Sequence, residues 1–345
     1  MTDIFGWDIG GAHLKLAHLR GGQLIAVRQI ACPLWEGVDR LRQALHAVIG
    51  RDDPSALHGI TMTGELVDSF SDRAAGVSAI LDILAEFIPT GSLHIYATSG
   101  GFIDPAEARV AIDKVASANW HATAYFLAHN VADGALVDIG STTTDIVPFR
   151  DGNVVARGID DATRLATGEL VYTGVVRTPL CAVAHRVAFD GTLTGIMAEW
   201  FATTADIYRI TGQLPDDADL HRTADGRGKS VPESRARLAR MIGRDAVTAP
   251  DKAWTQLAET FIHHQIHRIE ESCRQVLSAV DLRADAPIVG AGIGRFLSAE
   301  IARRLGRPYR DLGSLVAAPD GVAQSAAAHA PAVAVALLLR DRVRP

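Results

Sequence analysis

The chain has 345 residues, a length that favours two domains because a single domain usually holds about 100–200 residues. Hydrophobic residues make up 48% of the chain and charged residues 21%, a composition that excludes an intrinsically disordered polymer. The formal net charge of −6 argues against nucleic acid as a partner, because proteins that bind nucleic acid usually present a basic surface.

The sequence gives no sign of a membrane segment. No stretch reaches the roughly 18 consecutive apolar residues of a membrane span, and the N-terminus lacks a basic segment followed by an apolar run. Three cysteines, Cys32, Cys181 and Cys273, stand at no spacing typical of metal ligands. They are predicted to be reduced, buried thiols, which fits a cytoplasmic location without a membrane partner.

The first half of the chain alternates predicted strands and helices. A strand-like run, IFGWDIG, passes through a polar turn into a second strand, and a third strand returns after Gly21-Gly22. Further elements follow in the order helix 38–49, strand 59–63, helix 73–87, strand 93–98 and helix 105–116. This order is typical of an α/β layer in which helices cover a mixed sheet.

The second half begins with another predicted hairpin and then becomes less regular. A polar stretch at 158–179 precedes a helix candidate at 197–211 and an exposed loop or insertion at 215–233. Arg235, Arg237, Arg240 and Arg244 have helical spacing and are predicted to form a solvated helix face, with contact to an acidic substrate as the alternative. A helix at 253–280, a strand and glycine turn at 286–294, a helix at 296–305 and an Ala-rich helix at 326–339 complete the order.

These elements predict two domains with a cleft between them. The first domain spans residues 1–130 and the second spans 131–325, with an inserted helical and loop segment at about 180–250. The C-terminal helix, at 326–342, is expected to pack on the first domain.

An internal repeat relates the two halves at an offset of 130 residues, which places Asp8 on Asp138. Residues 8–26 read DIGGAHLKLAHLRGGQLIA, and residues 138–156 read DIGSTTTDIVPFRDGNVVA. Both copies contain a strand, a short polar turn, a second strand, a Gly-containing turn and a third strand. The repeat predicts two duplicated β-meanders, although the alternative remains that duplication kept only the shape of the hairpin and that the turns simply need glycine.

Both polar turns have the composition of a phosphate-binding loop. In the first turn Asp8 precedes Gly10, Gly11 and His13, and glycines allow backbone N–H groups to approach phosphate oxygens closely. The second turn adds hydroxyl donors, and its members are Asp138, Gly140, Ser141, Thr142, Thr143 and Asp145. A carboxylate beside a phosphate needs a cation between them, so we expect Mg²⁺ to be oriented by Asp8 and Asp138 through water.

Two further features bear on the cleft. Lys15 in the first copy corresponds to Asp145 in the second, and it either reaches a phosphate or is an exposed hairpin lysine. The third glycine turn contains Gly290, Gly292 and Gly294 after an apolar strand. Its position in the chain disfavours a Rossmann unit, and it is expected to bind a nucleotide, or a phosphate at a helix N-terminus.

The three glycine clusters, in this order and over nearly the whole chain, resemble those of the actin-like ATPase superfamily of sugar kinases, Hsp70 and actin. The resemblance implies two duplicated actin-like (ribonuclease H-like) α/β domains with a central cleft. The segments TMTGEL at 61–66, VDIGSTTTD at 137–145 and GELVYTGVVRTP at 168–179 resemble the hydantoinase/oxoprolinase-like group. The chain is too short for the extra domains of true oxoprolinases, and it is similar to the short members linked to tetrahydromethanopterin-dependent one-carbon metabolism and methanofuran biosynthesis.

That resemblance implies an alkyl transfer in which an aminomethylfuran methyl diphosphate condenses with the phenol of a tyramine or tyrosine unit and releases diphosphate. The partners would be a small phosphorylated substrate and a phenolic acceptor, with Mg²⁺ and without a requirement for ATP. Glu65 is then the first choice of general base. The alternative is that Glu65 only begins a helix, near its N-terminal dipole. Glu169 and Arg177 would bind the substrate amine and the diphosphate, unless they belong to an ordinary surface loop.

Two other classes of function remain open at this level. The first is an ATP-dependent small-molecule kinase or amidohydrolase on the same fold, and the second is a nucleotide-gated binding protein without chemistry on a second substrate. ADP formation that depends on an acceptor would favour the kinase, and tight nucleotide binding without turnover would favour the binding protein.

Overall fold

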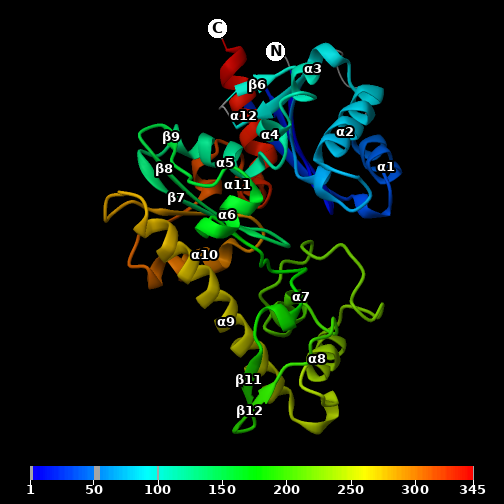
Figure 1. Cartoon of the computed structure of the whole chain (residues 1–345), viewed down its shortest axis with the longest axis vertical. Coiled ribbons are helices and arrows are strands. Elements are labelled where there is room, and N and C mark those ends of the chain that lie inside the picture. Colours follow the sequence, from blue (N-terminus) through cyan, green and yellow to red (C-terminus); the bar gives the residue numbers. More distant parts are fainter. Residues whose placement is uncertain (1–2, 50–54, 99–100, 345) are drawn as a thin grey trace.

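The computed structural model describes residues 3–49, 55–98 and 101–344, and Figure 1 shows their arrangement. Two mixed sheets with covering helices form the upper part of the molecule in this view, and a smaller helical part extends below them. The fold is therefore the mixed α/β fold expected from the sequence, with two sheets of related topology.

The first sheet has the strand order β3-β2-β1-β4-β5-β6. β1 pairs with β2 in antiparallel orientation and with β4 in parallel orientation, and all six residues of β1 are buried. Gly6 in β1 is required because a Cβ there would lie 2.1 Å from the carbonyl oxygen of Ala332 in the covering C-terminal helix. The strands of this sheet are β1 (Ile4–Ile9), β2 (His13–Arg20), β3 (Gln23–Ala31), β4 (Leu57–Met62), β5 (Leu93–Ala97) and β6 (Gly101–Ile103).

The second sheet repeats the central part of the first. Its order is β10-β8-β7-β13-β14, with β9 also paired to β8. β7 is antiparallel to β8 and parallel to β13, just as β1 is antiparallel to β2 and parallel to β4. The internal repeat predicted from the sequence is therefore also present in the structure. The strands are β7 (Asp133–Ile139), β8 (Thr144–Arg150), β9 (Asn153–Val154), β10 (Leu170–Val171), β13 (Ile288–Ala291) and β14 (Tyr309–Asp311).

Helices cover the outer face of the first sheet and fill the space between the two sheets. α1 (Asp39–Val48) and α2 (Arg73–Phe87) contribute to the apolar core on the outer face. α5 (Asn119–Ala128) and α12 (Ala330–Val343) contact each other and share one core with residues of both sheets, and α12 lies on β1, β2 and β4. The division of the chain near residue 130 stays a prediction.

The structure corrects two predicted helices. The stretch 105–116 forms two short helices, α3 (Pro105–Ala108) and α4 (Ile112–Val115), and α5 follows without having been predicted, because its faces are almost uniformly buried and carry no amphipathic period. The Ala-rich segment forms α11 (Asp320–Ala328) and α12, which are bent by 110° relative to each other. Together the two bent helices have the length and apolar composition of a membrane span, whereas no single helix within the described ranges is long and apolar enough.

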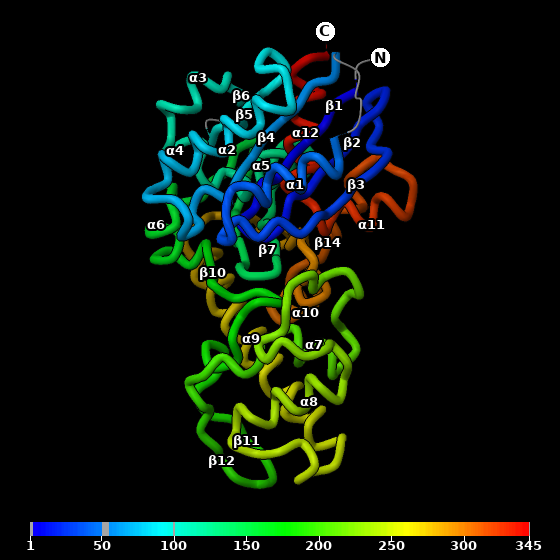
Figure 2. Tube along the Cα trace, turned by 90° about the vertical axis from the view of Figure 1, so that its right-hand side faces the viewer, coloured from blue at the N-terminus to red at the C-terminus, as the bar shows by residue number. Residues whose placement is uncertain are grey.

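The lower part contains α7 (Thr204–Ile210), α8 (Val231–Arg240) and the hairpin of β11 (Arg186–Phe189) and β12 (Thr192–Gly195). Figure 2 shows it as a narrower extension below the two sheets. The predicted helix at 197–211 is thus shorter than expected, because Thr203 caps α7 and sets its start. α6 (Asp161–Thr167), α9 (Asp251–Ser278) and α10 (Arg295–Arg304) complete the helices, and α9 runs from the second sheet into the lower part (Figure 1).

The arginine run on α8 is not the uniform solvated face that the sequence predicts. Arg237 is completely buried and forms ion pairs of 2.8 Å with Asp206 and 3.1 Å with Asp225. Asp206 lies on α7 and Asp225 lies in the loop before α8, so one guanidinium joins these segments. The loop at 215–229, which has no helix or strand of its own, is therefore tied to a buried charge network.

Candidate active site

The first polar turn connects β1 to β2 and is fixed by its own backbone. The amide of Gly10 donates to the carbonyl of His13 at 2.9 Å. The amides of Leu34 and Cys32 donate to the carbonyls of Gly11 and Ala12, which fixes the end of β3 against the turn. The amides of Gly11 and Ala12 themselves have no hydrogen-bond acceptor within the described ranges, so they are free to bind an anion.

The second turn, between β7 and β8, has the same geometry. The amide of Gly140 donates to the carbonyl of Thr143 at 2.9 Å, as Gly10 does to His13. The amides of Ser141 and Thr142 find no acceptor in the part of the chain that the structure describes, and their hydroxyls lie 3.4 Å apart. Each half of the duplicated fold thus presents free amides at the end of a buried strand.

Both turns line one cleft of about 540 Å³ between the two sheets, which we call the central cleft. The structure brings together here most of the site residues predicted from the sequence. They are Asp8, Gly10, Gly11, His13, Lys15, Asp138, Gly140, Ser141, Thr142, Thr143, Asp145 and Arg177.

The second turn concentrates negative charge in the central cleft. Burial, together with the nearby carboxylates of Asp145 and Asp8, raises the pKa of Asp138 to about 7, although Lys15 opposes this shift. Burial also raises the pKa of Asp145, and the guanidinium of Arg164, 2.8 Å away, opposes it. Asp138 has no basic partner within ion-pair distance among the described residues, so a cation at this position would relieve the repulsion.

The carboxylate of Asp8 has one engaged and one free oxygen. Its Oδ2 lies 3.3 Å from the Nζ of Lys15, whereas its Oδ1 is buried and has no hydrogen-bond partner within the described residues. No group of three or more His, Cys, Asp or Glu side chains converges as a metal site in the described ranges. The residues present therefore fit a hydrated Mg²⁺ held by Asp8 and Asp138 through water better than a cation enclosed by protein ligands.

Arg177 is fixed beside the second turn by the segment 173–178. The amides of Val176 and Arg177 both donate to the carbonyl of Ser141, at 3.1 and 2.8 Å. Gly174 is required there, because a Cβ would lie 2.5 Å from the backbone of Ser141. The guanidinium lies 4.8 Å from the ring centre of Trp35 and forms no ion pair within the described residues, so it is available to an anionic ligand.

Glu65 and Glu169 lie outside the central cleft. The side chain of Glu65 is buried behind Ser117, whose hydroxyl donates to Oε1 at 3.0 Å, and burial raises the pKa of this carboxyl. Glu169 is also buried, and its two oxygens accept the amides of Arg157 and Gly158 at 2.6 and 2.7 Å. Ser117, but neither glutamate, lines the cleft, and the proposed roles of both glutamates stay predictions.

The third glycine turn packs against the second turn. A Cβ on Gly292, whose φ is +81°, would lie 2.3 Å from the carbonyl of Ile139 and 2.4 Å from Oδ1 of Asp138. Added Cβ atoms on Gly290 and Gly294 would meet Tyr309 and Ile139 at 2.7 and 2.6 Å. The cavity beside Gly292 has a volume of only about 30 Å³, far smaller than the central cleft.

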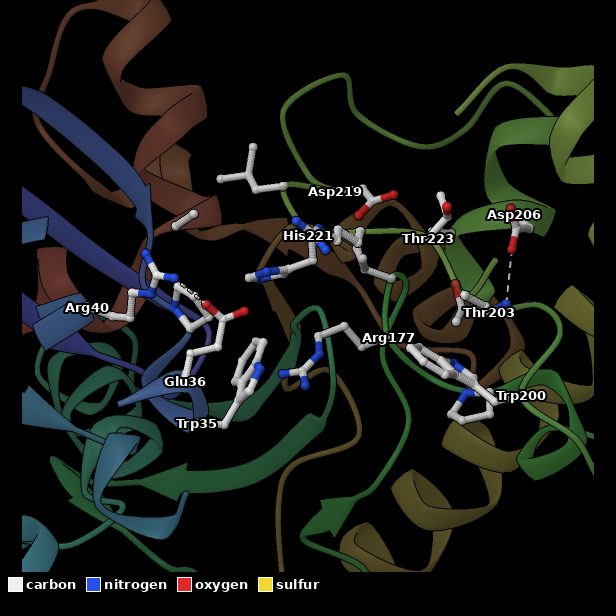
Figure 3. Close-up of a pocket in the computed structure, with 18 of the residues that line it drawn as sticks. Trp35, Glu36, Arg40, Arg177, Trp200, Thr203, Asp206, Asp219, His221 and Thr223 are labelled. Atoms are coloured by element: carbon white, nitrogen blue, oxygen red, sulfur yellow. Dashed lines mark hydrogen bonds and ion pairs between the residues drawn. The ribbon is translucent and has the colours of Figure 1, made fainter. Parts of the chain in front are cut away.

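Sequence reasoning missed a second, larger cavity next to the central cleft. This side cavity, shown in Figure 3, has a volume of about 850 Å³ and lies between the end of β3, α1, α7 and the loop at 219–224. Trp35 and Arg177 line both the side cavity and the central cleft. Trp35, after the third strand, and His221, in a polar loop, belong to no periodic sequence pattern. Only their position in the fold identifies them as cavity-lining residues.

Both the sequence and the fold of this chain are similar to those of known proteins. A profile of the Hydantoinase/oxoprolinase family matches residues 57–334. Among solved structures, the nucleotide-free form of acetone carboxylase aligns with a TM-score of 0.57 at 12% identity, over 96% of this chain and 70% of that one, a likeness of fold. The chain belongs to the hydantoinase/oxoprolinase family and has its duplicated actin-like fold.

Two curated relatives narrow the class of protein further. The chain is 33% identical over 290 residues to the (4-{4-[2-(gamma-L-glutamylamino)ethyl]phenoxymethyl}furan-2-yl)methanamine synthase of Methanocaldococcus jannaschii, covering 84% of this chain and 86% of that protein. It is 26% identical over 221 residues to the synthase of the same name from Methanococcus vannielii, covering 64% of this chain and 97% of that one. These relatives identify the chain as an enzyme of the transferase type.

Proposed function

We propose that this chain joins an aminomethylfuran methyl diphosphate to the phenol of a tyramine- or tyrosine-type acceptor, as a step in the biosynthesis of a methanofuran-type cofactor. The observation that carries this proposal is the 33% identity to a synthase whose name describes a phenoxymethylfuran amine. The bond formed is the ether between the phenol and the furan methylene group, and diphosphate is the leaving group.

The two polar turns suit the binding of diphosphate. The amides of Gly11, Ala12, Ser141 and Thr142, which have no acceptor among the described residues, need no rearrangement to meet phosphate oxygens. Such pre-oriented donors stabilise the charge that grows on a leaving group. The guanidinium of Arg177 adds a cation without an ion-pair partner in the described ranges. These groups favour departure of diphosphate from the furan methylene carbon.

The acidic side chains require a counter-charge before a diphosphate can enter. Asp8 and Asp138 would hold Mg²⁺ through water, and the orphaned Oδ1 of Asp8 supports this assignment. When bound, Mg²⁺ would neutralise part of the diphosphate charge and so make it a better leaving group. Lys15 lies 3.3 Å from Asp8 and contributes positive charge on the same side of the central cleft.

The walls of the central cleft suit a reactive furan. Leaving-group departure gives a delocalised furfuryl cation, which needs protection from water until the acceptor attacks. Leu66, Val67 and Leu170 supply aliphatic lining, together with the largely buried ring of Trp120, over which Arg164 lies 4.0 Å from the ring centre. Diphosphate and furan can therefore occupy the same cleft with their polar and apolar ends against different walls.

The close packing of the third glycine turn supports a substrate other than ATP. ATP would need room for adenine beside the third glycine turn, where the cavity next to Gly292 holds about 30 Å³. The glycines of that turn are explained by close packing against Ile139, Asp138 and Tyr309, without a nucleotide. We therefore expect the reaction to proceed without ATP.

A direct assay tests this function. The purified protein is supplied with the furan diphosphate, tyramine and Mg²⁺, and inorganic diphosphate and the phenol ether are measured together. We expect equal amounts of both products without ATP. Strict dependence on ATP hydrolysis, or turnover of ATP alone with both partners present, would contradict the proposal and favour an ATP-dependent kinase.

The three free cysteines support the further proposal of a cytoplasmic location.

A further inference from the structure

The proposed reaction needs a place for the phenolic acceptor, and the side cavity is adjacent to the central cleft. It is larger than the central cleft, at about 850 against 540 Å³, and the two share Trp35 and Arg177. Trp35 and Trp200 are both more than one-third exposed and line the side cavity, so two aromatic faces are available for stacking. In Figure 3 Trp35 and Arg177 point toward each other from different elements.

Two histidines meet at the boundary between the cleft and the side cavity. His13 lines the central cleft and His221 lines the side cavity, and their ring centres lie 4.8 Å apart. The ring of His221 also lies 5.4 Å from that of Trp35. The Nε2 atoms of both histidines are buried and have no hydrogen-bond partner in the described ranges. Unpaired buried nitrogen atoms are rare in native proteins, so these two neighbouring rings call for an explanation.

The loop that carries His221 is fixed by ion pairs. Asp219 lies 2.7 Å from Arg209 on α7 and 3.4 Å from Lys229. Arg237 on α8 binds Asp225 farther along the same loop. Charged contacts therefore hold the loop on both sides of the histidine, and the imidazole lines the side cavity from this anchored loop.

We propose that the side cavity binds the aromatic acceptor with its phenol at Trp35, and that the imidazole of His221, which lines this cavity, removes the phenolic proton. This inference rests on the proposed function and assigns the acceptor site and the base. The phenolic oxygen forms a bond to the furan methylene carbon, while the bond from that carbon to diphosphate breaks and its electron pair leaves with diphosphate. The proton passes to the imidazole of His221 and then to water, so no further reactant is needed.

The surroundings of His221 keep the imidazole neutral and able to accept a proton. Burial lowers its pKa most, the cations Arg177 and Lys229 lower it further, and the carboxylates of Asp219 and Glu36 act in the opposite direction. The neighbouring ring of His13 is also neutral at pH 7, since burial lowers its pKa to about 3. Glu65, by contrast, does not line the central cleft or the side cavity.

The first experiment tests the base with His221→Gln and the matched control His267→Gln, a histidine two-thirds exposed on α9. Coupling of the furan diphosphate to tyramine should fall at least about 100-fold in His221→Gln and stay unchanged in the control. Fluorinated tyramines, whose phenols are more acidic, should progressively restore the rate of His221→Gln. The rate of this variant should also keep rising toward the phenol pKa of about 10, whereas the wild-type rate levels off above pH 7.

The second experiment tests the acceptor site by filling the side cavity. Ala31 is exposed at the end of β3 and lines the cavity, and Ile25 is exposed on the same strand away from it. Ala31→Trp should weaken tyramine binding at least tenfold, and Ile25→Trp should not. Inorganic diphosphate should bind both variants as it binds the wild-type protein.

Defined results would overturn this inference. They are coupling by His221→Gln within twofold of wild type, an equal defect with every phenol, unchanged tyramine affinity in Ala31→Trp, or an equal loss in Ile25→Trp. A wild-type protein that makes no ether contradicts the proposed function separately. In that case selective loss of tyramine binding in Ala31→Trp still supports the cavity as a phenol site.

Discussion

Lys15 lies directly across the β1–β2 pair from Asp8, with 3.3 Å between Nζ and Oδ2. The equivalent cross-strand pair in the second copy is Asp138 and Asp145, so a carboxylate replaces the amine. Like charges at directly opposed positions repel each other, and Arg164 compensates Asp145 from outside the strand pair. The duplicated scaffold has therefore become electrostatically asymmetric, with the Lys15–Asp8 ion pair on one side of the central cleft and excess negative charge on the other.

The carboxylates of the two turns should be essential for turnover and dispensable for folding. We expect Asp8→Asn and Asp138→Asn each to lower kcat for ether formation by about 100-fold or more, because each removes a charge that orients the cation. Circular dichroism and thermal unfolding should show an intact fold. Asp113→Asn, at an exposed site outside the cleft, is the control. Nearly wild-type turnover in both cleft variants would remove this site from consideration.

Arg164 should be a structural residue as well as a charge in the cleft. Its side chain is buried, pairs with Asp145 at 2.8 Å and donates to the carbonyl of Glu169 at 3.0 Å. Arg164→Met leaves a buried carboxylate unpaired and should lower the free energy of unfolding by about 3–5 kcal/mol in urea titrations. Arg303→Met breaks only an exposed pair with Glu300 and should cost less than about 1 kcal/mol. Equal losses in the two variants would contradict the assignment.

His58 should make the stability of the protein depend on pH. Its ring accepts the indole N–H of Trp7 at 3.1 Å, and burial lowers its pKa from 6.5 to about 4. Between these values the unfolded chain binds a proton that the folded protein does not, so this contribution to stability is present above pH 6.5 and is lost as the pH falls. From pH 7 to pH 5, wild type should lose about 2 kcal/mol more than His58→Gln.

The comparison for His58 uses urea unfolding at each pH, with His267→Gln as a control at an exposed position. The control should follow the wild-type pH profile. Parallel profiles for wild type and His58→Gln would show that this imidazole titrates normally in the folded protein.

The third glycine turn should tolerate no side chain. Gly292→Ala forces a Cβ to within 2.4 Å of Oδ1 of Asp138, at a φ of +81°. We expect a loss of about 2 kcal/mol or more in the free energy of unfolding, together with lower activity from displacement of Asp138. Gly321→Ala, in α11 with nothing within 4 Å of the new Cβ, should be neutral or stabilising. A stable, fully active Gly292→Ala variant would contradict the close packing of the two turns.

Local sequence patterns were enough to predict the duplicated scaffold. The turns after β1 and β7 were recognisable because a carboxylate and glycines follow a buried strand in each copy. The strand and helix order was also readable where elements have one polar and one apolar face, as in α1, predicted at 38–49 and observed at Asp39–Val48. α5 escaped prediction because it is covered by β7, β8 and α12, so its sequence lacks a polar stripe.

By itself, the sequence determined the paired turns and the carboxylates that follow their strands, because these features depend on residues within one hairpin. Only the tertiary structure decided that His221 meets His13, that Arg237 is buried and that Glu65 lies behind Ser117. Each of these outcomes depends on how distant segments pack, since burial and charge come from neighbours in space that no local period of the chain records.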